Sequence, residues 1–240
     1  MNSCIVERFS ELRELDENEV ELLGSLERDL KSYAVGERLQ SIGELATHFF
    51  TLHGGWACSV RVLADGQRQV LDIFLPGQVM GLREMGFDQT HAEIVALTDV
   101  EACPFPRARL KELFREAPRL GELFFIVMAR EHAMLTERMI SIGRRPALKL
   151  IAHFLLEFKV RLGCSADEFE LPLNQPVIGD ALGLSAVHVS RTLSTLRKQG
   201  LVAADNGTIR LLDVDKLVEL AEFERGYLDC QLRWAQVARD

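Results

Sequence analysis

One amphipathic segment, residues 186–199, carries side chains that could read the edges of DNA bases. Its apolar residues Val189, Leu193 and Leu196 recur at spacings of four and three, which predicts a helix with one buried face. The polar face and the N-terminal end carry Val187, His188, Ser190, Arg191, Thr195 and Lys198. A guanidinium can donate two hydrogen bonds to guanine O6 and N7, worth about 1–3 kcal/mol of base discrimination. Arg191 is therefore the leading candidate for base recognition.

The residues around this segment predict a helix-turn-helix followed by a wing. Asn174 and Pro176 are typical of a helix start, Gly183 of a helix end, and Ser185 of the cap of a second helix. Two short helices with a glycine turn between them make a helix-turn-helix. Strand-like residues 201–204 and 208–212 flank Asp205-Asn206-Gly207, a tight hairpin signal.

The charge distribution supports DNA binding by this region alone. The whole chain has a net charge of −8, whereas residues 144–210 hold nine Lys and Arg against six Asp and Glu. A locally basic surface attracts phosphate without making the whole protein adhere to DNA. A helix pair can also merely pack, and it is the wing and the local charge that favour DNA binding here.

A long helical stretch, residues 107–142, precedes this region and carries a coiled-coil seam. Its heptad-like residues are Phe125, Met128, His132, Leu135, Met139 and Ile142. Such a seam needs a partner helix, supplied either by the chain's own core or by a second subunit. We favour a homodimer because the series runs along most of the helix. His132 is interpreted as a packed or hydrogen-bonded histidine of the seam.

The N-terminal half predicts a β-barrel or jelly roll. An amphipathic helical pattern over residues 9–26 leads into alternating strands between Phe49 and Leu75, with a turn at Asp65-Gly66. Further strands are expected over 91–97 and 100–105, and a helix over 213–240. The predicted fold is α+β, with a β-roll effector domain at 1–115, a dimerisation helix at 116–143 and a winged helix-turn-helix domain with a helical extension at 144–240.

Composition narrows the class of protein further. The chain has 240 residues, 48% of them hydrophobic, and its longest apolar run, residues 124–129, is far too short to cross a bilayer. The N-terminus lacks the pattern of a secretory leader, so we expect a cytoplasmic protein without membrane contact. Five cysteines without a CxxC pair suggest neither a disulfide framework nor a four-thiolate metal cluster.

The order of β-roll, long helix and IGDALGLSAVHVSRTLSTLRKQGLV resembles the Crp/Fnr family of bacterial transcription regulators, as do the turns DGQRQVL and LPGQVMGL. The resemblance implies a cyclic-nucleotide-binding-like effector domain and a homodimer that reads pseudo-palindromic double-stranded DNA. It places base reading at Val187, Ser190 and Arg191, and phosphate contacts at Asn174, Gln175, Ser185 and His188. Val187 stands where many members have a glutamate, and Ala186 where an arginine can occur, so the half-site need not be the usual one.

The same resemblance argues against cyclic AMP as the effector. Leu82 stands where the family's ribose-binding glutamate would be, and His91-Ala92 where its phosphate-binding arginine and serine would be. Arg83 is close in sequence to this turn, and its guanidinium could pair with a phosphate. The candidate effector contacts are therefore Gly81, Leu82, Arg83 and His91, for an effector that stays unidentified.

The sequence identifies no cofactor. An iron–sulfur cluster needs four cysteines, and Cys4 stands alone near the N-terminus. Haem stays open because one axial ligand suffices, and His48, His53, Cys58 and His91 all lie among the strands. Isolated histidines among strands are usually structural, so no metal ligand is assigned. Cys103 is interpreted as a small core residue rather than an oxidant sensor.

Two other classes of protein are alternatives to a transcription regulator. A regulator is expected to have no enzymatic activity. A metal-dependent cupin enzyme would need about three His or Glu ligands, and the sequence has no HxH pair followed by a spaced glutamate. A β-roll module that recognises only a protein partner would show no salt-dependent DNA binding. Contact with RNA polymerase, which would make the protein an activator rather than a repressor, has no signature in the sequence.

Overall fold

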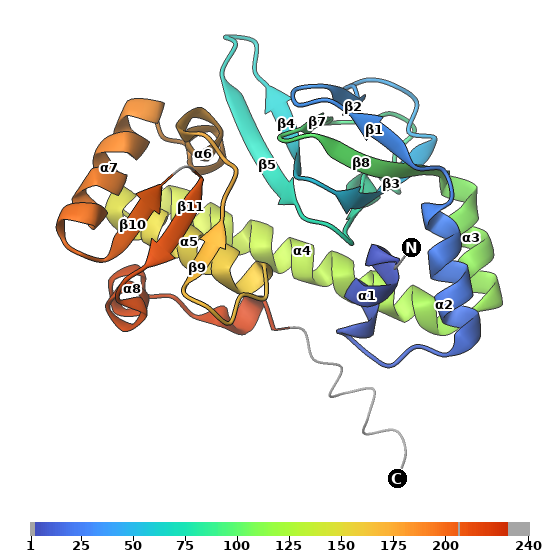
Figure 1. Ribbon diagram of the computed structural model, residues 1–240. Helices are drawn as coiled ribbons and strands as arrows, with labels where there is room; N and C mark the ends of the chain where they lie inside the picture. Colours follow the sequence, from blue (N-terminus) through green and yellow to red (C-terminus); the bar gives the residue numbers. More distant parts are fainter. Residues whose placement is uncertain (1–2, 206, 230–240) are drawn as a thin grey trace. The chain divides into compact units, whose positions relative to one another are not determined.

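The computed structural model describes residues 3–205 and 207–229, which form two compact units (Figure 1). The first unit contains residues 3–61 and 72–131, and the second contains residues 62–71 and 132–229. Helix α4 (Pro118–Arg144) contributes residues to both units. The α+β prediction is confirmed, with a strand-rich N-terminal half, a long helix and a helix-turn-helix with a wing.

Two four-stranded antiparallel sheets form the β-roll. One sheet has the order β1 (Lys31–Tyr33), β8 (Val100–Pro106), β3 (His48–Gly54), β6 (Val79–Met80), and the other has the order β2 (Arg38–Gln40), β7 (Glu93–Ala96), β4 (Ala57–Val62), β5 (Arg68–Phe74). Side chains from both sheets, Leu52, Met80 and Ala96 among them, form one buried cluster. Gly66, with φ of 84°, makes the turn expected at Asp65-Gly66.

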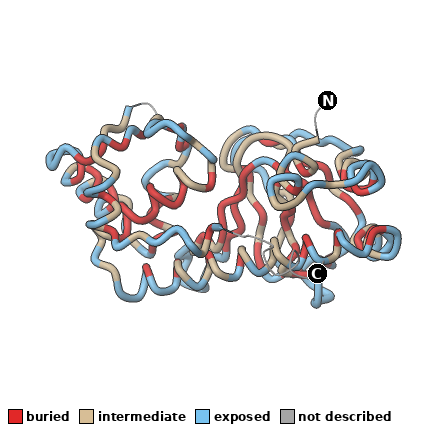
Figure 2. Tube along the Cα trace, turned by 90° about the horizontal axis from the view of Figure 1, so that it is seen from below, coloured by how far each residue is buried: buried red, intermediate tan, exposed pale blue. Residues whose placement is uncertain are grey.

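Helices close one end of this β-roll with a second apolar cluster. They are α1 (Cys4–Ser10), α2 (Glu17–Gly24), the 3-10 turn η1 (Ser25–Glu27), α3 (Arg107–Glu116) and the first turns of α4. Phe9 packs against Phe124 with ring centroids 4.9 Å apart, and both rings are buried. Buried stretches of the chain are red in Figure 2, and both units contain them. The predicted helical stretch over 107–142 is interrupted at Ala117, because the residue before a proline disfavours the helical conformation.

The second unit is built around the buried helix α5 (Ala147–Arg161). Its other elements are β9 (Glu168–Glu170), α6 (Gln175–Leu182), α7 (Ala186–Lys198), β10 (Val202–Asp205), β11 (Thr208–Leu211), α8 (Val214–Ala221) and the 3-10 turn η3 (Arg225–Tyr227). The wing is confirmed as a sheet of order β10-β11-β9. Strand β9 was not expected from the sequence; it pairs with β11 and buries Phe169 opposite Ile209.

The C-terminal helix is shorter than the sequence predicts. Helix α8 ends at Ala221, and Glu222 takes a left-handed conformation with φ of 51°, which stops the helix. Leu217 and Ala221 are fully buried, and α8 packs against α5. The predicted continuation through Leu232 and Trp234 lies outside the described residues.

Polar groups buried along α5 form one connected network. Glu157 lies 3.4 Å from both Arg138 and Arg161, and the Tyr227 hydroxyl donates to its other oxygen at 3.1 Å. His153 Nε2 lies 3.2 Å from a Glu137 oxygen, and its ring stacks on Tyr227. Burial, followed by the nearby Arg145 charge, lowers the pKa of His153. The folded protein therefore favours neutral imidazole at this position.

We expect His153 to make this unit acid-sensitive. Because its pKa is lower in the folded state, the unfolded chain binds the additional proton first, and stability falls as the pH drops below about 6.5. Urea unfolding of His153→Gln and of the parent at pH 7.5, 6.5 and 5.5 measures this. The parent should lose more stability on acidification than the variant. His48→Gln, which changes an exposed histidine, serves as the control. Equal pH slopes in all three proteins would contradict the assignment.

Candidate nucleic-acid interface

The helix-turn-helix is held by the caps that the sequence predicts. The Asn174 side chain accepts a hydrogen bond from the Val177 amide at 2.9 Å, which caps α6. Gly183 ends α6 with φ of 67°, and Ser185 caps α7 by accepting from the His188 amide at 3.2 Å. Side-chain caps satisfy amides that have no partner within the helix. The angle between the two helices is therefore set by local hydrogen bonds and one left-handed glycine.

Helix α7 buries one face and leaves the other open. Val189 and Leu196 are fully buried, Leu193 is nearly so, and α7 packs against both α5 and α6. On the opposite face Val187 is 61% exposed, and His188 and Arg191 are exposed as well. The predicted apolar stripe is thus confirmed, and Val187 and Arg191, two of the side chains proposed to face bases, are exposed on the open face.

Four of the predicted DNA-contacting residues line one groove. This groove of about 550 Å³ lies between the start of α5 and α7, and its lining residues are Ala147, Leu148, Ser185, Val187, His188, Arg191, Thr192 and Thr195. Ser190 is half-buried on the neighbouring face, while Asn174 and Gln175 are exposed at the start of α6. Ala147 and Leu148 were not anticipated, because only the tertiary packing of α5 on α7 brings them here.

Four of the six residues of the predicted dimer seam are exposed to solvent in the single chain. Phe125 is 73% exposed, Met139 68% and Ile142 40%, and His132 is exposed between them on α4. Met128 and Leu135 are half-buried, and Met128 also packs against the helical core of the first unit. Large apolar side chains along one helix face favour a helix partner over solvent.

At the candidate effector turn, Arg83 and His91 already have carboxylate partners within the protein. Arg83 pairs with the buried Asp72 at 2.7 Å, and Glu84 accepts hydrogen bonds from the His91 amide at 3.1 Å and ring at 2.9 Å. Leu82 is 1% exposed within the apolar core, and Gly81 has φ of 91°. An effector contact at this turn stays a prediction, and a contact by Leu82 would require the core to open.

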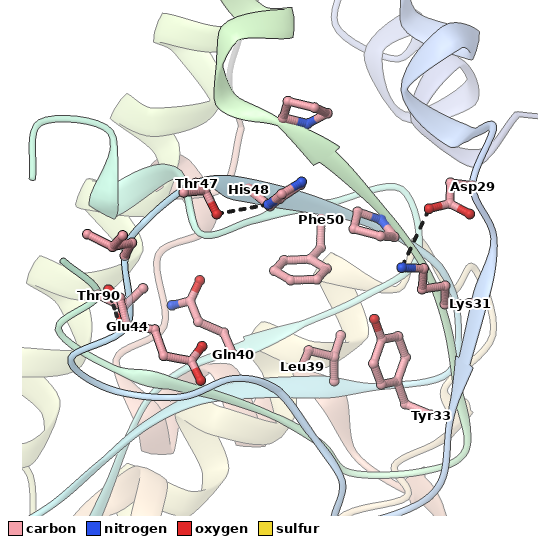
Figure 3. Close-up of a pocket in the computed structure, with 13 residues that line it drawn as sticks. Asp29, Lys31, Tyr33, Leu39, Gln40, Glu44, Thr47, His48, Phe50 and Thr90 are labelled. Carbon is pink, nitrogen blue, oxygen red and sulfur yellow. Dashed lines mark hydrogen bonds and ion pairs between the residues drawn. The ribbon is translucent and has the colours of Figure 1, made fainter. Parts of the chain in front are cut away.

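A separate cavity of about 550 Å³ opens in the β-roll (Figure 3). Phe50 and Leu39 give it an apolar interior, while Tyr33, Gln40 and His48 add polar groups. This size suits a small organic molecule. None of the four candidate effector residues lines it. This cavity could not be predicted from the sequence, since its lining residues come from β1, β2, β3 and β8, which are separated along the chain.

The buried thiol Cys103 fits its predicted place in the core. Cys103 is fully buried in β8. Burial, with a smaller contribution from Glu27, raises the pKa of its thiol to about 11. The thiol is therefore protonated near neutral pH, whereas reactive cysteines carry a lowered pKa.

A β-roll followed by a long helix and a winged helix-turn-helix defines a class of DNA-binding regulators with a separate sensor domain. Residues 30–117 match the cyclic nucleotide-binding domain model, and residues 151–220 match the Crp-like helix-turn-helix domain model. The chain is 30% identical to the nitrogen fixation regulation protein FixK of Bradyrhizobium diazoefficiens, over 92% of this chain and 93% of that protein. The chain belongs to the Crp/Fnr family of transcription regulators.

Other relatives agree with this assignment. The transcriptional activator protein FnrA of Stutzerimonas stutzeri is 30% identical over 78% of each chain. The solved structure of FixK2 from Bradyrhizobium japonicum superimposes with a TM-score of 0.74 at 29% identity, covering 80% of this chain and 96% of that one. Among the described residues, no helix is both long and apolar enough to cross a bilayer.

We expect the close contact inside the helix-turn-helix to tolerate only glycine at position 179. A Cβ at Gly179 would lie 2.4 Å from the Leu184 carbonyl oxygen, inside the turn between α6 and α7. Gly179→Ala should therefore destabilise the second unit by about 1–3 kcal/mol, the usual cost of overpacking. Chemical unfolding measures this change. Gly226→Ala is the control, because a Cβ there meets nothing within 4 Å. Equal stability of the two variants would contradict the close contact.

Proposed function

We propose that this regulator is a homodimer that reads a pseudo-palindromic DNA site with helix α7 of each subunit. The observation that carries the proposal is the groove on α7, where Val187, His188 and Arg191 are exposed opposite a fully buried stripe. A recognition helix needs this division, because one face must anchor to its domain while the other enters the major groove. The relatives named above are regulators, which favours this function over a cupin enzyme or a protein-binding module.

The proposed contacts divide into base reading and phosphate binding. Arg191 reads a guanine, with Val187 and Ser190 beside it on the same face. Asn174, Gln175, Ser185 and His188 lie at or near the starts of α6 and α7, where backbone amides favour phosphate. A valine at 187 accepts no hydrogen bond, so the base pair facing it is read by apolar contact alone.

Two α4 helices would pair along the seam and set the half-site spacing. A two-fold dimer binds half-sites about one helical turn, roughly 34 Å, apart. Exposure of Phe125, His132, Met139 and Ile142 supports this pairing. In this dimer each β-roll could influence DNA binding through the paired α4 helices.

The β-roll is the proposed site of signal reception, in a protein that works in the cytoplasm. Arg83 and His91 already pair with carboxylates, which disfavours a cyclic phosphate at the turn. The cavity beside Phe50 offers room for an effector of another kind. Contact with RNA polymerase would make the regulator an activator.

Replacing Arg191 tests base reading. Random duplexes are selected with the parent, and the affinity of Arg191→Ala for the enriched site is then measured across a salt series. We expect a loss of at least about tenfold, because each guanidinium–guanine pair contributes about 1–3 kcal/mol. Binding to unrelated DNA should change far less.

Arg197→Ala is the matched control for charge. Arg197 is exposed on the same helix but does not line the groove. It should weaken specific and nonspecific binding by similar factors. If Arg191→Ala behaves like Arg197→Ala at the enriched site, Arg191 does not read a base. Failure of the parent to enrich any site, with and without oxygen or candidate nucleotides, would refute sequence-specific binding.

A charge in the seam should separate the subunits. Met139→Asp places a carboxylate at an apolar heptad position, where pairing would bury it without a counter-charge. We expect monomers in sedimentation and loss of cooperative binding to the palindrome, with the fold of each subunit unchanged in circular dichroism. Arg144→Gln changes the charge equally off the seam and should remain dimeric. A dimeric Met139→Asp protein would place the interface elsewhere.

A further inference from the structure

Three side chains that are distant in sequence meet where α1, η1 and β3 pack together. Cys4 begins α1, Glu27 ends η1, and His53 lies in β3. One ligand atom from each, a thiol sulfur, a carboxylate oxygen and a ring nitrogen, lies within 4.8 Å of the other two. All three belong to the first unit. Nothing in the spacing of these residues along the chain connects them, so they could not be predicted as a set of metal ligands.

Polar atoms in this cluster are buried without partners. The Glu27 side chain is 6% exposed and the His53 side chain 16%. Glu27 Oε1 accepts from the Ile5 amide at 3.2 Å, but Glu27 Oε2 and His53 Nδ1 have no hydrogen-bond partner among the described residues. The 3.9 Å between His53 Nδ1 and Glu27 Oε1 is too long for a hydrogen bond. Burying such groups unpaired is costly, and a cation would remove that cost.

Backbone packing fixes the cluster in place. In the metal-free protein the Cys4 thiol donates to the His53 carbonyl oxygen at 3.3 Å, so the start of α1 lies against β3, and a cation would displace this proton. A Cβ on Gly77 would lie 2.6 Å from the Cys4 carbonyl oxygen, so the turn at Gly77 approaches the start of α1 closely. The donor atoms are therefore positioned by the folded unit rather than by a free chain end.

We propose that Cys4, Glu27 and His53 bind one divalent cation of the zinc, cobalt or ferrous class. A thiolate, a carboxylate and an imidazole are the ligands that such borderline ions prefer. The two negative charges of the thiolate and the carboxylate balance the cation. Three protein ligands leave a fourth position for water, as in sites where the ion remains accessible.

Binding would require only a small contraction of the cluster. With metal–ligand bonds of about 2.0–2.3 Å, tetrahedral ligand atoms lie about 3.3–3.8 Å apart, against the 4.8 Å limit of the metal-free arrangement. The bound ion would tie α1 and η1 directly to β3. This site is additional to the proposed DNA-binding function, and its test uses no DNA, so the two can fail independently.

Cobalt is the direct probe. Reduced full-length protein, stripped of metal with a chelator, is titrated with Co²⁺ and followed by absorption. We expect one equivalent to give tetrahedral visible bands and a thiolate-to-cobalt charge-transfer band, both removed by Zn²⁺. Cys4→Ser should abolish the charge-transfer band, and Glu27→Gln and His53→Gln should weaken binding by more than about tenfold. Cys164→Ser and His48→Gln are the matched controls and should bind like the parent.

A second measurement uses only the parent protein and so does not depend on the folding of a variant. Zn²⁺ should protect Cys4, but not Cys164, from alkylation, as read by peptide mapping. Absence of a charge-transfer band in the parent would overturn the proposal, and so would a band that survives Cys4→Ser. Equal alkylation of Cys4 with and without Zn²⁺ would also overturn it and would leave a hydrated polar pocket in place of a metal site.

Discussion

The burial of one stripe of α7 against α5 is the interaction on which the DNA-facing half of this protein depends. Val189 and Leu196 have no exposed surface, so α7 cannot rotate without pulling apolar groups into water at about 25 cal/mol per Å². That restraint is what leaves Val187, His188 and Arg191 exposed in one groove. The packing of α7 therefore determines which side chains can reach DNA, and hydrogen bonds from those side chains would supply the sequence specificity.

Helix α5 can serve as that anchor because its buried carboxylate, Glu157, has partners within the protein. Glu157 receives contacts from two arginines and from Tyr227, so this carboxylate can be buried in the interior of the second unit. Breaking one partner would leave the others with an uncompensated charge, which makes the network cooperative. Residues from α4, α5 and η3 take part, and the network therefore joins segments that lie far apart in sequence.

Local signals predicted much of this fold, and tertiary contacts account for what was missed. Asn174, Gly183 and Ser185 set the helix ends through hydrogen bonds within a few residues, so their types alone were sufficient. Strand β9 was missed because three residues carry too little periodicity, and its pairing with β11 is what makes it a strand. The groove floor at Ala147 and the cluster of Cys4, Glu27 and His53 depend on contacts between distant segments, which spacing along the chain does not report.

The hydrogen bonds from His91 to Glu84 also give the β-roll turn a permanent internal competitor. Glu84 is a carboxylate tethered a few residues from its partner, and short tethers produce effective concentrations in the millimolar range or above. Any anion approaching the His91 amide must first displace this resident group. Weakly binding anions would therefore be excluded by mass action, and only a ligand that binds more tightly than this tethered carboxylate could occupy the turn.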